Sequence, residues 1–150
     1  MAKGRADPRG PGRVGGFELL EHTADVGIRA RGASIEEVFE HATEGLAEVL
    51  GALRPGGPGE AVAVEVAAPD PGGLLVDWLN EVLWLREVRG AVVAGVRVER
   101  VGDATAAGSV VLGAGGAGPD GTFVKAVTYH RLRVEPDPGG GWVAEVYLDV

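Results

Sequence analysis

The sequence contains no cysteine, which excludes disulfide bonds, thiolate metal sites and cysteine nucleophiles. It also has no apolar run near the roughly 18 residues that a helix needs to cross a bilayer. Residues 1–16 lack the apolar segment of a secretory signal. Together these absences predict a cytoplasmic protein that does not enter a membrane.

Serine is almost as scarce, since Ser34 and Ser109 are its only two occurrences, and neither stands in the Gly-x-Ser-x-Gly pattern of a serine hydrolase. Glycine is abundant, at 26 residues, but no glycine-rich segment ends in the Lys-Ser/Thr pair of a phosphate-binding loop. The glycine- and alanine-rich residues 113–118 also lack the strand-to-helix setting of such a loop. We therefore expect no catalytic residue and interpret the chain as a non-enzymatic protein.

The net charge of −8 is unevenly distributed along the chain. Residues 1–13 carry four basic residues and one acidic residue, which leaves a net charge of −11 on residues 14–150. An acidic body repels a phosphate backbone, and nonspecific nucleic-acid binding depends on clustered Lys and Arg. We predict no strong direct binding to nucleic acid, so a function in RNA metabolism would need another protein to hold the RNA.

Residues 1–16 have no periodic apolar pattern and are predicted to form a flexible tail, whereas residues 17–150 have the length of one domain. Alternating apolar residues predict strands, and apolar residues three or four positions apart predict helices. The expected order is two strands, a helix, a strand, a second helix and four strands, over residues 17–22, 26–31, 35–50, 61–67, 74–89, 92–101, 109–112, 123–135 and 142–149. Short connections favour antiparallel pairing. The sequence thus predicts an α+β fold, with two helices packed on a mostly antiparallel β-sheet.

The first helix has a clear signal at each end. Ser34 is a favourable N-cap, and Glu37 three positions later completes a capping box. Gly51 suits the positive φ that often follows the last turn of a helix. His41 stands beside the apolar stripe and is predicted to be solvated. Elsewhere, residues 69–72 are interpreted as a turn and residues 113–121 as a flexible loop.

Two carboxylates stand where their side chains can project from the end of a sheet. Asp25 lies in the short connection between the first two strands, and Asp149 precedes the terminal carboxylate of Val150. Adjacent anions repel each other unless a cation or a basic side chain neutralises them. Oxygen ligands of this kind suit a hard cation such as Ca²⁺ or Mg²⁺. A solvated strand end with no metal is the alternative interpretation.

Two histidines could extend such a site. His22 stands three residues before Asp25, and His130 lies in the middle of a late strand. Either imidazole could serve as a metal ligand or in acid–base chemistry. The alternative for a histidine at a strand end is a hydrogen bond that caps a turn.

Four segments of the sequence, in the same order, resemble the archease family. They are HTADVGI at residues 22–28, LVDWLNE at 75–81, VKAVTYH at 124–130 and the ending VYLDV at 146–150. The resemblance covers residues 17–150 and leaves only the tail outside it. One departure is the loop at residues 113–118, which holds only glycine and alanine where the family usually carries polar and charged residues.

The resemblance implies an accessory protein in tRNA processing and tRNA splicing. Archeases are small α+β proteins that activate the GTP-dependent RtcB-type RNA ligase by promoting its guanylylation and multiple turnover. The family's metal-binding site corresponds to Asp25, Asp149 and the main chain of Val150, with calcium as the expected cation and Mg²⁺ or Mn²⁺ as alternatives. Lys125 lies in a matching motif and is a candidate contact to the ligase, as are His22 and His130.

Two other functions fit the same residues. A metal-dependent hydrolase would use Asp25 and Asp149 with His22 or His130, but the sequence offers no convergent set of acid, base and nucleophile. A general chaperone or modulator of tRNA-modifying enzymes is the second alternative, and it too has been suggested for archeases.

Overall fold

A computed structural model describes residues 15–21 and 25–150 of the chain. Of the predicted tail, only residues 15 and 16 are described, and His22 lies outside the described residues. The two helices and seven strands follow in the predicted order, and the α+β fold class is confirmed. The elements are β1 (Gly16–Glu21), β2 (Asp25–Gly32), α1 (Ile35–Val49), β3 (Glu60–Ala67), α2 (Pro71–Arg89), β4 (Ala91–Val101), β5 (Thr105–Ala114), β6 (Ala126–Pro136) and β7 (Trp142–Asp149).

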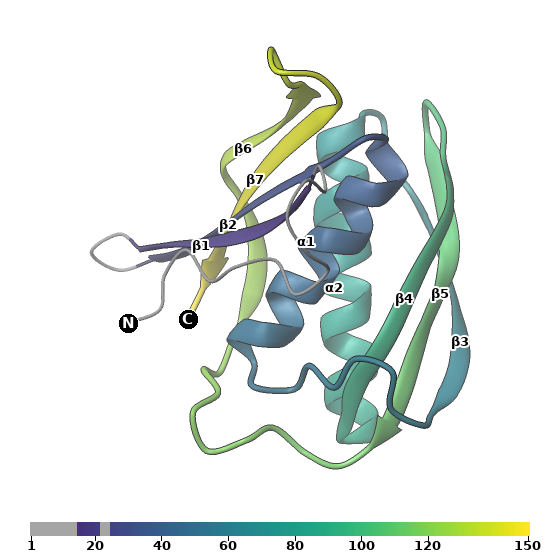
Figure 1. The fold of residues 1–150 in the computed structure, drawn as a ribbon, viewed down its shortest axis with the longest axis vertical. Coiled ribbons are helices and arrows are strands. Elements are labelled where there is room, and N and C mark those ends of the chain that lie inside the picture. Colours follow the sequence, from purple (N-terminus) through teal and green to yellow (C-terminus); the bar gives the residue numbers. More distant parts are fainter. Residues whose placement is uncertain (1–14, 22–24) are drawn as a thin grey trace.

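The strands divide between two sheets, and the helices form a layer between them (Figure 1). One sheet has the order β1-β2-β7-β6 and the other the order β3-β5-β4, and every pair of neighbouring strands is antiparallel. Helix α1 packs against β2 and β4, and α2 packs against β6 and β3, so each helix contacts both sheets. Neither helix is long and apolar enough to cross a membrane, within the part of the chain that the structure describes.

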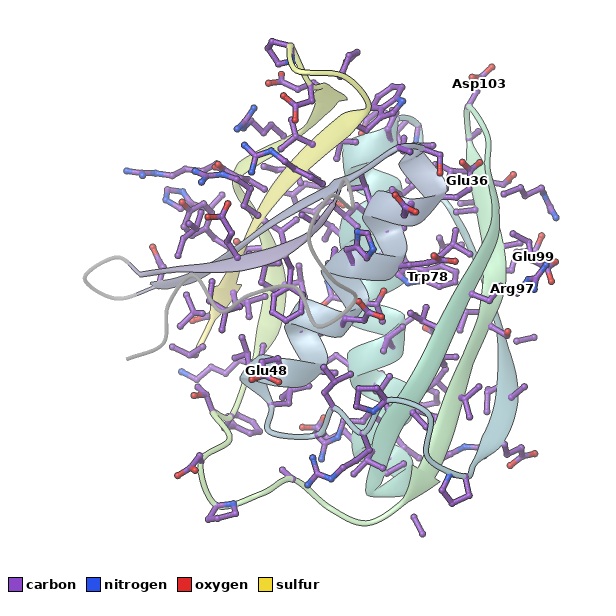
Figure 2. All side chains as sticks on the ribbon, in the orientation of Figure 1. Glu36, Glu48, Trp78, Arg97, Glu99 and Asp103 are labelled. Atoms are coloured by element: carbon purple, nitrogen blue, oxygen red, sulfur yellow. The ribbon has the colours of Figure 1, made fainter. Side chains whose placement is uncertain are left out.

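Because both faces of the helical layer are covered, a single core surrounds the helices. Trp78 and Phe39 are fully buried in it, and the indole N–H of Trp78 donates to Thr43 Oγ1 at 3.0 Å (Figure 2). The prediction that His41 is solvated was wrong, because His41 is 1% exposed and its Nδ1 lies 2.6 Å from the carbonyl oxygen of Arg31. The Gly16 N–H also donates to His41 Nδ1 at 3.0 Å, so the imidazole is covered by β1 and β2 although it lies beside the apolar stripe.

Both ends of α1 follow the sequence signals. The Ser34 hydroxyl accepts from the Glu37 N–H at 3.1 Å, and Gly51 has a φ of 68°. The start of α2 differs from the prediction, because residues 69–72 do not form a separate turn. Asp70 is the N-cap, its carboxylate accepts from the Gly73 N–H at 2.7 Å, and Pro71 is the first helical residue. Proline is tolerated there because the first helical N–H groups have no intrahelical acceptor.

Strand β5 is longer than the predicted residues 109–112, since it runs from Thr105 to Ala114. It is the central strand of its sheet, and pairing on both sides overrides the weak strand preference of its alanines and glycines. Strand β6 starts at residue 126 and not at 123. The loop between these strands is tied to the end of α1, because the N–H groups of Gly118 and Thr122 donate to the carbonyl oxygens of Gly51 and Val49. The loop that was predicted to be flexible over residues 113–121 is thus hydrogen-bonded to the end of α1.

Candidate functional site

Asp25 and Asp149 are brought together by the pairing of β2 with β7. Asp25 opens β2 and Asp149 ends β7, and their Cα atoms are direct partners in the antiparallel register. Directly opposite residues share one face of a sheet, with Cβ atoms about 4.5–5.5 Å apart. The alternation along β7 places Ala144, Val146 and Leu148 in the core, so both aspartates lie on the outer face. The predicted convergence of these two residues is confirmed.

The two carboxylates have no basic side chain paired with them within residues 15–21 and 25–150. Asp25 is half-buried and Asp149 is exposed. Like charges directly opposite each other destabilise an antiparallel pair. The described residues hold no group of three or more His, Asp or Glu side chains placed to bind a metal, so these two carboxylates form a pair.

Lys125 joins this end of the sheet through its main chain. Its N–H donates to the carbonyl oxygen of Asp149 at 2.7 Å, and its side chain is exposed. Val150 follows directly and is 38% exposed. The structure therefore places Lys125, Asp149 and Val150 together beside Asp25, at one end of the four-stranded sheet.

His130 lies on the same sheet but is not beside the aspartates. It stands in a bulge of β6, where Thr128 and Arg133 oppose Tyr147 and Glu145 across β7. The His130 ring meets the Tyr147 ring edge-on, at 6.1 Å between centroids. The His130 ring thus contacts Tyr147, and His130 does not form a metal-binding group with the two aspartates in the described residues.

The bulge in β6 was not predicted from the sequence. Arg131 has a φ of 54°, the only positive value for a non-glycine residue in the described ranges, and its guanidinium carbon lies 6.0 Å from the Tyr147 ring centroid. A left-handed conformation is sterically costly for arginine and persists where the surroundings hold it. Bulges re-aim side chains and often lie near functional sites. The only signal of the bulge in the sequence was that Tyr129, His130 and Arg131 do not alternate between apolar and polar residues.

The Tyr147 ring occupies the space that a side chain at position 27 would fill. The two residues are cross-strand partners, and a Cβ on Gly27 would lie 2.6 Å from Tyr147 Cε2 and 3.1 Å from Leu20 Cβ. Tyr147 is only 4% exposed, so its ring has little room to move. The glycine within the HTADVGI segment is therefore required by the tyrosine that packs across it.

We expect Gly27→Ala to lower the free energy of unfolding by about 1–3 kcal/mol, because the added methyl group must displace the Tyr147 ring. Urea denaturation followed by circular dichroism measures the change. Gly116→Ala is the matched control, since a Cβ there meets nothing within 4 Å, and we expect it to stay within about 0.5 kcal/mol of wild type. Equal effects of the two substitutions would contradict the packing role of Gly27.

A row of ion-paired side chains, formed by Arg29, Glu145 and Arg133, lies on the same outer face as the aspartates. Arg29 Nε donates to Glu145 Oε2 at 2.7 Å, and an Arg133 guanidinium nitrogen reaches the same oxygen at 3.3 Å. Partial burial of Glu145 alone would raise the pKa of its carboxyl, but the hydrogen bonds from Arg29 and Arg133 outweigh this effect and lower that pKa below its ordinary value of 4.5. The hydrogen bond that Arg29 donates to Glu145 likewise raises the pKa of Arg29.

This row predicts a loss of stability in acid. A carboxyl whose pKa is lower in the folded state stabilises the protein above its unfolded pKa, and that contribution disappears as the pH falls through the folded value. We expect Glu145→Gln to be about 1–2 kcal/mol less stable than wild type at pH 7. The difference will shrink as the pH falls below about 4.5, as measured by thermal unfolding across a pH series. A difference that stays constant down to pH 2 would show that Glu145 contributes no charge interaction.

Two sheets that enclose a pair of helices, with a carboxylate pair exposed at one strand end, define a class of small single-domain α+β proteins whose candidate site is an acidic surface. Comparison with known proteins identifies the class. The archease protein family (MTH1598/TM1083) matches residues 17–150. The chain belongs to this family.

Individual relatives agree with this assignment. The chain is 38% identical to the archease of Thermococcus gammatolerans over 141 residues, which cover 89% of this chain and 98% of the relative. It is 36% identical to the archease of Methanosarcina mazei over 140 residues, or 89% and 95% of the two chains. Among solved structures, Methanobacterium thermoautotrophicum protein 1598 superposes with a TM-score of 0.68 at 29% identity, over 90% of this chain and 99% of that one. A Thermotoga maritima archease, described as a possible chaperone, gives a TM-score of 0.60 at 26% identity, over 87% and 94%.

Proposed function

We propose that this protein is a metal-binding activator of an RtcB-type RNA ligase in tRNA splicing, and that it has no catalytic residue of its own. The observation that carries the proposal is the pair formed by Asp25 and Asp149, which the fold brings together on an exposed surface of an archease-family chain. The pair lies at a strand end, where a second protein has access to it.

A divalent cation at this pair would remove an unfavourable interaction. Two carboxylates and the neighbouring main-chain oxygens offer only hard oxygen ligands, which are the ligands that Ca²⁺ prefers and that Mg²⁺ and Mn²⁺ accept. We propose that Asp25, Asp149 and the main chain of Val150 hold the cation, with Ca²⁺ as the first expectation. Waters or groups of the ligase would complete its coordination.

Activation then follows from differential binding. An activator shifts its enzyme toward the reactive conformation only if it binds that conformation more tightly than the idle one. A hundredfold shift requires about 2.7 kcal/mol of such preference. We propose that the acidic pair with its cation, and the exposed Lys125 beside it, form the surface that distinguishes the two conformations of the ligase. The ligase holds the RNA, since the acidic body of this chain does not attract phosphates.

A ligase turnover assay tests the proposal. The chain is added to a purified RtcB-type ligase with GTP and RNA ends, and guanylylation of the ligase and the number of ligation turnovers are measured. We expect the wild-type chain to raise both, and Asp25→Asn to remove the effect. Asp103→Asn is the control, since Asp103 is an exposed aspartate at the tip of the β4–β5 hairpin (Figure 2), and we expect it to activate like wild type.

Other results would replace the proposal. The general chaperone role would hold if this chain leaves the guanylylation and turnover of the ligase unchanged but stabilises an unrelated tRNA-modifying enzyme. Phosphoester hydrolysis by the isolated chain that disappears in Asp25→Asn would favour the hydrolase. Covalent labelling of the isolated chain by GTP would show that it has a catalytic residue.

A further inference from the structure

Two edge strands of this protein are covered by specific hydrogen bonds. On β4, the N–H groups of Val98 and Val101 donate to the carboxylates of Glu40 and Glu36 on α1, at 2.9 and 3.1 Å. On β6, the side-chain amide of Asn80 pairs with both the N–H and the carbonyl oxygen of Val127, at 2.9 and 3.0 Å. These bonds occupy backbone groups that would otherwise be free to pair with another chain.

Strand β3 is different, although it is also an edge strand. No hydrogen bond to its outer backbone exists within the described ranges 15–21 and 25–150. The strand contains no proline or lysine, and its register with β5 has no bulge. Each of its two acidic residues forms an exposed ion pair within the chain, Glu60 with Arg89 at 3.0 Å and Glu65 with Arg100 at 3.4 Å. Proline, lysine, a bulge and a hydrogen bond to the outer backbone, which keep an edge strand from pairing, are therefore absent from β3 as the structure describes it.

Exposed apolar side chains of α2 flank this open edge. Trp84 is 56% and Val88 63% exposed, and they stand one turn apart on the same face of α2. Asn80 binds β6 and Arg89 binds β3, so helical geometry places this face between the two edge strands. The open backbone edge of β3 thus adjoins an apolar face of α2. Strand β3 lies on the side of the molecule away from the C-terminus (Figure 1).

The sequence of β3 is self-complementary about Val64. If two copies pair antiparallel with Val64 opposite Val64, then Val62 lies opposite Val66, and Ala61 opposite Ala67, in both directions. The core-facing valines stay in register, and Glu65 meets the small exposed Ala63 of the other copy. No like charges face each other in this register. We propose that β3 pairs with β3 of a second copy of this chain, which joins the two three-stranded sheets into one sheet of six strands.

The resulting dimer is symmetric and closed, because a two-fold axis through Val64 uses the same surface on both copies. The shared edge is short, at eight residues, so we expect weak, concentration-dependent association with the Trp84 side chains adding apolar contact. The two Asp25–Asp149 pairs would remain exposed on the outer sides. The inference stands independently of the proposed activation of a ligase.

Two substitutions at Ala63 test both the surface and the register. Ala63→Glu places a carboxylate opposite Glu65 of the second copy twice per dimer, whereas Ala63→Lys places an ammonium group there. Analytical ultracentrifugation from about 1 µM to about 1 mM measures the dissociation constants. We expect Ala63→Glu to raise the constant about tenfold, and Ala63→Lys to leave it unchanged or lower it. Circular dichroism checks that both variants fold, which the exposure of Ala63 favours.

Amide hydrogen exchange supplies a second measurement on the unmodified chain. We expect backbone amides of residues 60–67 to become more protected as the concentration rises, while those of β4 do not change. A wild-type chain that stays monomeric throughout the range would overturn the proposal. So would a dimer that the two Ala63 variants weaken equally, or open-ended assembly into larger species.

Discussion

Asparagine at position 25 or 149 is expected to abolish the rise in thermal midpoint that Ca²⁺ gives the wild-type protein. A ligand bound only by the folded state, at a hundred times its dissociation constant, stabilises that state by about 2.7 kcal/mol. For a domain of this size the thermal midpoint then rises by roughly 9 °C. Without the cation, each substitution is expected to stabilise the protein, because removing one of two opposed carboxylates relieves their repulsion. Each variant will be more stable than metal-free wild type by a few tenths of a kcal/mol and less stable than calcium-loaded wild type.

Differential scanning calorimetry of wild type and of both variants, each with Ca²⁺ and with a chelator, measures these differences. The double variant Asp25→Asn/Asp149→Asn is expected to respond like either single variant, since residues of one site do not act additively. Asp103→Asn is expected to keep the full calcium response. A calcium response that is the same in wild type and in both site variants would contradict the assignment of this pair as the metal site, and the family membership would be unaffected.

The second large effect is expected in the core. Trp78 is fully buried between the two sheets and binds Thr43 of the other helix. We expect Trp78→Ala to lower the free energy of unfolding by about 3–5 kcal/mol, because it removes the largest buried side chain and leaves a cavity. This is a large share of the 5–15 kcal/mol that typically stabilises a domain, so urea denaturation is the suitable measurement.

Trp84→Ala is the matched control, since the same residue type stands on the same helix but is 56% exposed. In dilute solution we expect it to change the free energy of unfolding by less than about 1 kcal/mol. If both tryptophan variants lose similar stability, the burial of Trp78 between the two sheets would not be the source of the effect.

Local signals in the sequence were sufficient for most elements. Ser34 and Glu37 located the start of α1, and the alternation along β7 gave its bounds at residues 142–149 as observed. What local signals could not give was the division of the strands between two sheets. That division depends on which strands pair, and pairing between residues more than a hundred positions apart leaves no local pattern. The burial of His41 depends on non-local contacts in the same way, because its imidazole lies against β1 and β2, where it contacts Gly16 and Arg31.

Only part of the candidate site was predictable, because the sequence indicates single residues but not which residues oppose each other across strands. Asp25 and Asp149 were identified as isolated carboxylates at strand ends, and the family resemblance joined them before any register was known. The interlocking of Gly27 with Tyr147 and the ionic row around Glu145 were not predicted. Both depend on which residues oppose each other across β2, β7 and β6. A one-residue change of register would move every one of these side chains to the other face.

The pairing of β2 with β7 also determines when the acidic pair can form during folding. Strands β4 and β5 join residues that are close in the chain, as do the β1–β2 and β6–β7 hairpins, whereas the contact between β2 and β7 closes a loop of more than a hundred residues. Contacts of long sequence separation carry the largest entropic cost and form late. We therefore expect the carboxylates to meet only after the hairpins and the helical layer are in place. A partly folded chain would then not present the pair, and a cation that requires both aspartates would report the completed fold.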